Sequence, residues 1–170
     1  MKTIAAFIAL VLVVCGTAHT LDAQQPPTIL TTGSNRGLGL EFAKQYAAAG
    51  WNVIATARDV TTAKELRELA SRNPRVALEK LDLLDRAGIK ALATKYRGRP
   101  IDVLLNNGGL LGDMKTQQLG SLDYKQFEDV MAVNVFAPLA MAEAFQDSVA
   151  ASQQKKIVSM TSRSGVISLP

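Results

Sequence analysis

The residues of this sequence best suited to chemistry are grouped in a glycine-rich turn at residues 32–39, which reads T-G-S-N-R-G-L-G. The turn lies between an apolar β-type run and an amphipathic helical pattern. Gly33 lets the chain turn out of the strand, Gly37 lets backbone approach a pyrophosphate, and Gly39 lets the helix pack near the strand. Because a helix N-terminus offers free N–H groups and a positive dipole end, this spacing predicts a phosphate site.

The elements that must position this turn alternate between strands and helices. Apolar β-type runs occur at residues 29–31, 53–55, 75–81, 101–105 and 156–160. Helical patterns lie between them at residues 38–49, 63–71, 86–96 and 124–150. Strands separated by helices imply right-handed βαβ crossovers, so we expect an α/β fold of Rossmann type, a doubly wound parallel sheet in three layers. In the first helix, helical spacing predicts a sheet-facing stripe of Leu38, Phe42, Tyr46 and Ala49.

Composition excludes several kinds of site. The 170 residues suit one domain, and the net charge of +4 comes from scattered basic residues, which argues against a nucleic-acid surface. His19 is the only histidine and Cys15 the only cysteine. Histidine-based triads, cysteine nucleophiles paired with histidine, and the common zinc sites therefore lack their parts, and we expect no metal. Acid–base chemistry is left to Tyr, Lys, Asp or Glu.

The spacing T-G-x-x-x-G-x-G resembles the short-chain dehydrogenase/reductase family over residues 28–170. The run A-T-A-R-D-V-T at residues 55–61 is most similar to its carbonyl-reductase-like and C-factor-like subgroup. The resemblance implies an oxidoreductase that transfers hydride between NADP(H) and a small carbonyl or alcohol substrate, and a homo-oligomer for the complete protein. By itself a glycine pattern would more often be an ordinary loop, and only its place between strand and helix favours the cofactor site.

Two arginines indicate which cofactor is bound. NAD-preferring Rossmann sites place an acidic residue near the end of the second strand to bind the ribose hydroxyls. Here Arg58 stands at that place and Arg36 lies in the glycine turn, and guanidinium groups would pair with a 2′-phosphate. Either arginine alone would more often be a surface charge, but the pair predicts NADP(H). The predicted contacts of the turn and this strand are Gly33, Ser34, Asn35, Arg36, Gly37, Leu38, Gly39 and Arg58.

The resemblance adds contacts after the third and fourth strands. Asp82, followed by Leu83, takes the place of the family's adenine-binding aspartate, whereas Asp85 is better placed to cap the next helix. The segment N-N-G-G at residues 106–109 is close to the family's N-N-A-G. We expect Asn107 and Gly108 to face the cofactor and Asn106 to brace the sheet, although a plain Asn-Gly turn would also fit this pattern.

Two further residues are candidates for catalysis. Ser162 ends the last predicted strand in a segment similar to the family's S-S-x-x-G, which implies a hydrogen bond to the substrate carbonyl oxygen. Asn134 lies on an otherwise apolar helix face, so its amide should have a defined partner, and Pro138 removes the helix donor for its carbonyl. The family uses an asparagine here to hold a water in the proton relay. Taken alone, a serine in such a Ser/Thr-rich turn would usually be structural.

The family's catalytic Tyr-x-x-x-Lys does not occur among these 170 residues. The fourth residues after Tyr46, Tyr96 and Tyr124 are glycine, proline and glutamate. We therefore expect residues 28–170 to form an NADP(H)-binding domain without its last strands and helices, nearly inactive by itself. The alternative is a non-catalytic nucleotide-binding or exported signalling protein of the same fold.

Residues 1–23 have the layout of a secretory signal peptide, with Lys2 before an apolar run at residues 4–15 and small residues after it. The run is shorter than the ~20 residues of a membrane-spanning helix, which makes a membrane anchor the weaker reading. A buried first element of the domain is another alternative, although residues 24–27 resemble a linker. The expectation is export or a periplasmic location, with cytoplasmic and membrane-anchored locations as alternatives.

Overall fold

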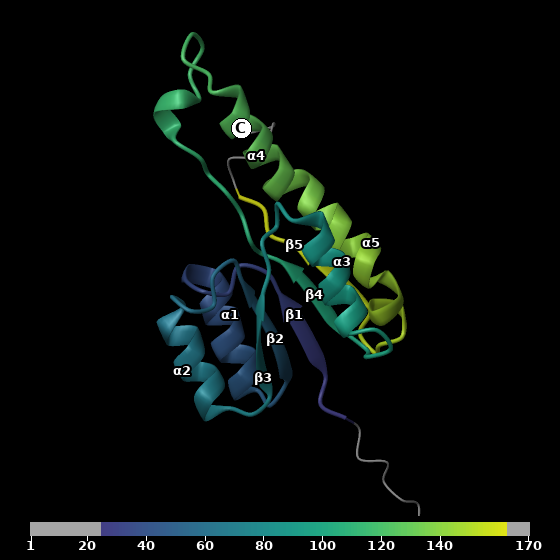
Figure 1. The fold of residues 1–170 in the computed structure, drawn as a ribbon. Helices are drawn as coiled ribbons and strands as arrows, with labels where there is room; N and C mark the ends of the chain where they lie inside the picture. The colour runs from purple at the N-terminus through teal and green to yellow at the C-terminus, as the bar shows by residue number, and fades with distance from the viewer. Residues whose placement is uncertain (1–24, 163–170) are drawn as a thin grey trace, which may run out of the picture.

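A five-stranded parallel sheet lies at the centre of the computed structural model, which describes residues 25–162 (Figure 1). Its strand order is β3-β2-β1-β4-β5, so the chain reverses its direction across the sheet after β3. The strands are β1 Thr28–Thr31, β2 Asn52–Ala57, β3 Val76–Lys80, β4 Val103–Asn106 and β5 Lys156–Ser159. This is the doubly wound arrangement that the alternation of patterns predicts.

Helices cover both faces of the sheet, as Figure 1 shows. One face packs against α1 (Gly37–Ala48) and α2 (Lys64–Arg72), and the other packs against α3 (Arg86–Lys95) and α5 (Ala137–Ala150). In β1, Ile29 belongs to the first core and its neighbour Leu30 to the second, and both are fully buried. Since side chains alternate along a strand, burial on both faces explains why these strands are continuous apolar runs.

The face that α1 buries differs from the predicted stripe. Leu40, Ala43 and Ala47 are buried with Gly39, whereas Leu38 is 63% exposed. Phe42 and Tyr46 pack only at the edge of this core, and the prediction was wrong for Leu38 and Ala49. Apart from Leu40, the residues that α1 buries are glycine and alanine, and the helical spacing of large apolar residues does not indicate such a face.

The long helical pattern of residues 124–150 is one helical run with an insertion. It consists of α4 (Tyr124–Met131), the π-helical segment η2 (Ala132–Phe136) and α5. The Ala137 N–H donates to the Ala132 carbonyl, five positions earlier instead of four. Pro138, which has no N–H to donate to the Asn134 carbonyl, lies where this wider turn ends, and a missing donor of this kind favours a π-bulge.

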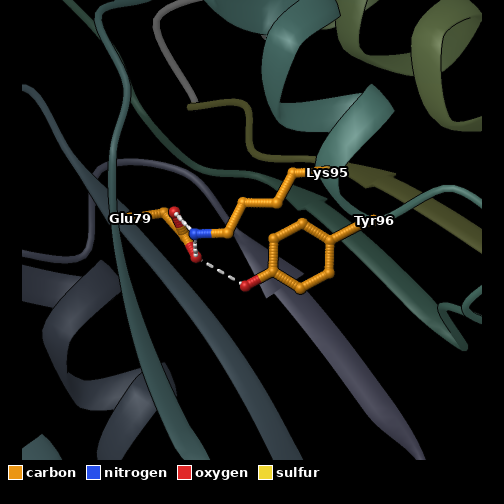
Figure 2. A network of polar contacts seen from close by, with 3 residues as sticks. All are labelled: Glu79, Lys95 and Tyr96. Atoms are coloured by element: carbon orange, nitrogen blue, oxygen red, sulfur yellow. Dashed lines mark hydrogen bonds and ion pairs between the residues drawn. The ribbon is translucent and has the colours of Figure 1, made fainter.

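A polar network joins α3 to the edge strand β3 (Figure 2). The Tyr96 hydroxyl donates to Glu79 Oε1 at 2.6 Å, and Lys95 Nζ contacts both carboxylate oxygens at 2.6 and 2.8 Å. Tyr96 is 5% exposed. Burial, followed by the hydrogen bond and the negative charge of Glu79, raises the pKa of Tyr96 above its ordinary value.

At the opposite edge of the sheet, as described by residues 25–162, lies β5, all four of whose residues are exposed. At the start of the described chain, the carbonyls of Pro26 and Pro27 accept hydrogen bonds from the Asn52 side chain and backbone. The end of the predicted linker is therefore held against β2. The predicted signal peptide lies outside the described residues, and within residues 25–162 no helix is both long and apolar enough to span a membrane.

Candidate functional site

A cleft of about 510 Å³ lies where the carboxyl ends of β1, β2, β3 and β4 meet. The structure brings nine of the twelve predicted cofactor contacts to it, namely Gly33, Asn35, Arg36, Gly37, Arg58, Asp82, Leu83, Asn107 and Gly108. The strand order reverses at β1, and open α/β sheets form their ligand crevices at such a switch point. The chemistry-bearing loops of the sequence thus converge on one site.

A larger cleft of about 700 Å³ opens at the other end of the sheet, beside the amino ends of the strands. Two polar side chains that line it, Asp102 and Asn52, are engaged within the protein. Asp102 accepts hydrogen bonds from three backbone N–H groups, and the Asn52 amide is bound to Pro26. We therefore place the candidate functional site at the smaller cleft.

The glycine turn forms a cradle at the N-terminus of α1. Gly33 and Gly37 have φ values of +68° and +56°, which side chains rarely adopt. A Cβ atom built on Gly37 would meet nothing within 4 Å, so the backbone there borders open space. Arg36, the N-cap residue of α1, provides no side-chain cap, and the first turn holds no acidic residue. The first N–H groups of the helix are therefore left for an anionic ligand.

The loop after β4 is hydrogen-bonded to this turn and stabilises it. Asn107 Nδ2 donates to the carbonyls of Thr32 and Gly33 at 3.0 and 3.2 Å, and the N–H groups of Asn107 and Gly108 both donate to Thr32 Oγ1. A Cβ on Gly39 would lie 2.2 Å from the Gly33 carbonyl oxygen. The fit leaves room only for glycine, which is why the helix can start directly behind the turn.

Thr32 is a structural member of this site that the sequence reasoning missed. It is buried and accepts hydrogen bonds from the loop after β4, but a threonine after an apolar run has many possible roles.

The structure also explains why residue 108 is glycine, where the family pattern has alanine. A Cβ there would lie 2.7 Å from Leu83 Cδ1, so glycine makes room for the tip of this leucine.

Acidic residues of the next loop are held by backbone groups. Asp85 is the N-cap of α3 and accepts from the Gly88 N–H at 2.9 Å, which confirms the predicted cap. Asp82 lines the cleft, and its Oδ1 accepts from the Leu84 N–H at 3.0 Å. Its carboxylate is therefore oriented before any ligand arrives.

Arg36 and Arg58 supply positive charge to the cleft, and both are exposed. Three ion pairs occur among residues 25–162, and neither arginine takes part in them. Asp59 and Thr62, which the sequence reasoning did not single out, line the same cleft. The signal available for them was their place directly after Arg58 in the run A-R-D-V-T-T.

Three predicted contacts do not line the cleft. Ser34 is fully buried, and its hydroxyl donates to the Thr31 carbonyl, so this side chain stabilises the turn itself. Gly39 is buried under the turn, and Leu38 is exposed beside the cleft residues without being one of them.

The two candidate catalytic residues also lie outside the cleft lining. Asn134 is exposed, not buried as its apolar neighbours suggested, but its amide has the defined partner that was expected. Its Oδ1 accepts from the Leu110 N–H and its Nδ2 donates to the Leu110 carbonyl, both at 2.8 Å. Ser162 is exposed three residues beyond β5, and Gly165 of its motif lies outside the described residues.

The fold and the cleft define a Rossmann-type domain, with its glycine turn at the switch point of the sheet. The sequence model of the family described as short chain dehydrogenase matches residues 27–170. The chain belongs to this family of oxidoreductases.

Relatives of known name or structure agree with this assignment. The chain is 29% identical to (+)-neomenthol dehydrogenase of Arabidopsis thaliana, over 84% of its own length and 55% of that enzyme. A short-chain dehydrogenase/reductase from Burkholderia multivorans with bound NADP superposes with a TM-score of 0.75 at 33% identity, over 84% of this chain and 61% of that one. NADPH-bound carbonyl reductase from chicken fatty liver gives a TM-score of 0.65 at 30% identity, over 73% and 52%. The chain spans about half the length of the first curated relatives that it matches.

Proposed function

We propose that this chain is the NADP(H)-binding part of an oxidoreductase that acts on a carbonyl or alcohol substrate. The observation that carries the proposal is the pair Arg36 and Arg58 in the cleft behind the glycine turn, both outside the ion pairs of residues 25–162. NADP-bound relatives support the same cofactor. When bound, NADP(H) would donate or accept the hydride at its nicotinamide ring.

The residues present fit such a cofactor. The open space above Gly37 can admit a pyrophosphate against the N–H groups of α1. The guanidinium groups of Arg36 and Arg58 would pair with the 2′-phosphate, while Asp82 would accept a hydrogen bond from the adenine. Each role follows from a donor or acceptor that already faces the cleft.

Catalytic roles belong to this proposal as well. Ser162 would donate a hydrogen bond to the substrate oxygen. Asn134, whose side chain is bound to the Leu110 backbone, would hold a water molecule of the proton relay. The 170 residues contain no Tyr-x-x-x-Lys, and therefore no group of that kind to protonate the substrate oxygen. Cofactor binding, not turnover, is the property to measure in this chain.

Fluorescence titration of the full chain with NADPH and NADH tests the proposal. We expect Arg58→Ala to weaken NADPH binding by about tenfold, because one charge-assisted pair to phosphate is lost, and to change NADH binding by less than about twofold. Arg97→Ala removes the same charge from an exposed residue outside the cleft and should change neither affinity.

An equal loss of affinity for both cofactors in Arg58→Ala would mean that this arginine does not read the 2′-phosphate. Absence of binding to either cofactor would refute the site as a whole.

A further inference from the structure

The loop between β2 and α2 contains a small clamp of three side chains, Asp59, Thr61 and Thr62. The Asp59 carboxylate accepts from the Thr61 N–H at 2.8 Å, from Thr61 Oγ1 at 2.6 Å and from Thr62 Oγ1 at 3.1 Å. Asp59 and Thr62 line the cleft, whereas Thr61 does not. The hydroxyl of Thr61 therefore acts on a cleft residue from outside the cleft.

The clamp holds a negative charge in a cleft that is expected to bind an anion. The cleft holds two guanidinium groups, Arg36 and Arg58, together with the carboxylate of Asp59. All three residues are exposed, and Asp59 directly follows Arg58. A carboxylate free to rotate there would be attracted to the guanidinium groups and would oppose any incoming anion. In the structure, all three donors to this carboxylate are uncharged groups of its own loop.

The Asp59 carboxylate does not lose its negative charge by protonation at neutral pH. The hydroxyl of Thr61, then its N–H and the hydroxyl of Thr62, lower the pKa of Asp59 below its ordinary value. The carboxylate stays negative at neutral pH, so only its orientation can keep it away from the arginines.

We propose that Thr61 is a positioning residue for cofactor selection. With Thr62 it holds the Asp59 carboxylate within the loop and leaves Arg36 and Arg58 available for the 2′-phosphate. This inference rests on the proposed function. It predicts that discrimination between phosphorylated and unphosphorylated adenosine depends on a hydroxyl group that is not part of the cleft lining.

The backbone of the loop has its own supports, so the hydroxyl can be removed by itself. The Thr61 carbonyl accepts from Arg67 at 3.1 Å, and the Thr62 carbonyl accepts from the Lys64 N–H at 2.9 Å. Thr61→Val keeps the shape of the side chain and the backbone N–H bond to Asp59 and loses only the Oγ1 donor. Thr61→Ser keeps a hydroxyl.

The experiment is calorimetric titration of the full chain with adenosine 2′,5′-bisphosphate and with 5′-AMP, which differ only in the 2′-phosphate. We expect Thr61→Val to weaken binding of the bisphosphate by about fivefold and of 5′-AMP by less than about twofold, because the released carboxylate competes for the arginines. Thr61→Ser should bind both ligands as the unaltered chain does. In an Asp59→Asn background, Thr61→Val should have no effect, since no carboxylate is left to compete.

A loss that is equal for both ligands, or that persists in the Asp59→Asn background, would overturn the inference, since the hydroxyl would then merely support the loop. Arg58→Ala distinguishes a failure of the positioning role of Thr61 from a failure of the proposed function. If it lowers the preference for the bisphosphate while Thr61→Val does not, the positioning role is wrong and the proposed function stands. If Arg58→Ala leaves the preference unchanged, both are wrong.

Discussion

At the scale of single residues, Tyr96 connects burial, charge and stability most directly. Its ring is buried against the sheet, and the Arg99 guanidinium lies 5.5 Å from the ring centroid. Its hydroxyl donates to the carboxylate of Glu79, whose side chain is only 12% exposed (Figure 2). The neutral phenol is a good donor to this carboxylate, whereas a phenolate beside it would be repelled. The same contact therefore stabilises the fold at neutral pH and opposes ionisation.

We expect Tyr96→Phe to lower the free energy of unfolding by about 1–2 kcal/mol at neutral pH, because a hydrogen bond to a charged group is lost. The pKa of Tyr96 is higher in the folded chain than its ordinary value of 10.0. The stability it contributes is therefore fully present below pH 10.0 and declines as the pH rises above that value. Urea unfolding as a function of pH should show a shallower alkaline decline in Tyr96→Phe.

Tyr124→Phe is the matched control, since that tyrosine is 73% exposed. An alkaline decline of the same steepness in the unaltered chain and in Tyr96→Phe would count against the Tyr96 argument.

At the scale of elements, the π-helical segment η2 places Asn134 where its amide can pair with the Leu110 backbone. Leu110 is 24 positions away in sequence and lines the cleft. The long helix thus holds the loop that follows β4, through one side chain with both a donor and an acceptor. The position of this helix therefore affects the position of the loop at Leu110, which lines the cleft.

We expect Asn134→Ala to accelerate amide hydrogen exchange at Leu110 by about tenfold or more. The variant removes both side-chain bonds to Leu110, including the acceptor of this N–H, and a loss of about 1.4 kcal/mol already changes a local opening equilibrium tenfold. The Thr32 N–H, which donates to the Leu105 carbonyl within the sheet, should exchange as before. Unchanged exchange at Leu110 would show that the loop does not depend on the helix.

At the scale of the whole molecule, Asp102 joins distant parts of the chain at the amino end of the sheet. Its side chain is buried and accepts from the N–H groups of Thr28, Gln153 and Gln154 at 2.8, 3.2 and 3.2 Å. Thr28 begins β1, and the two glutamines lie between α5 and β5. One carboxylate therefore connects the start of β1 to the segment that leads into β5, the last strand among residues 25–162.

We expect Asp102→Ala to lower the free energy of unfolding by about 2–4 kcal/mol, because three backbone donors lose a charged acceptor in a buried place. Asp85→Ala, which removes an exposed helix cap, should cost about 1 kcal/mol. Urea denaturation of both variants measures the two free energies of unfolding. Equal losses would show that Asp102 does not hold these distant segments together.

The sequence by itself determined what depends on neighbours along the chain. The alternation of apolar runs and helical patterns predicts the sheet and its crossovers, the glycine spacing predicts the turn, and Asp85 is recognisable as a cap. These signals work because backbone conformation, helix ends and strand burial follow from residues a few positions apart. The family pattern added the positions after β3 and β4 that line the cleft.

Only the tertiary structure decided which atoms meet across the fold. Thr32 and Asn107 are 75 positions apart, and nothing local in either residue indicates that they lock the turn together. The sheet packs against the face of α1 that carries Leu40, Ala43 and Ala47, which leaves Leu38 exposed. The tertiary structure also decided that Asn134 is exposed and bound to Leu110. Such contacts depend on three-dimensional packing and the satisfaction of polar groups, and helical or strand periodicity carries no information about either.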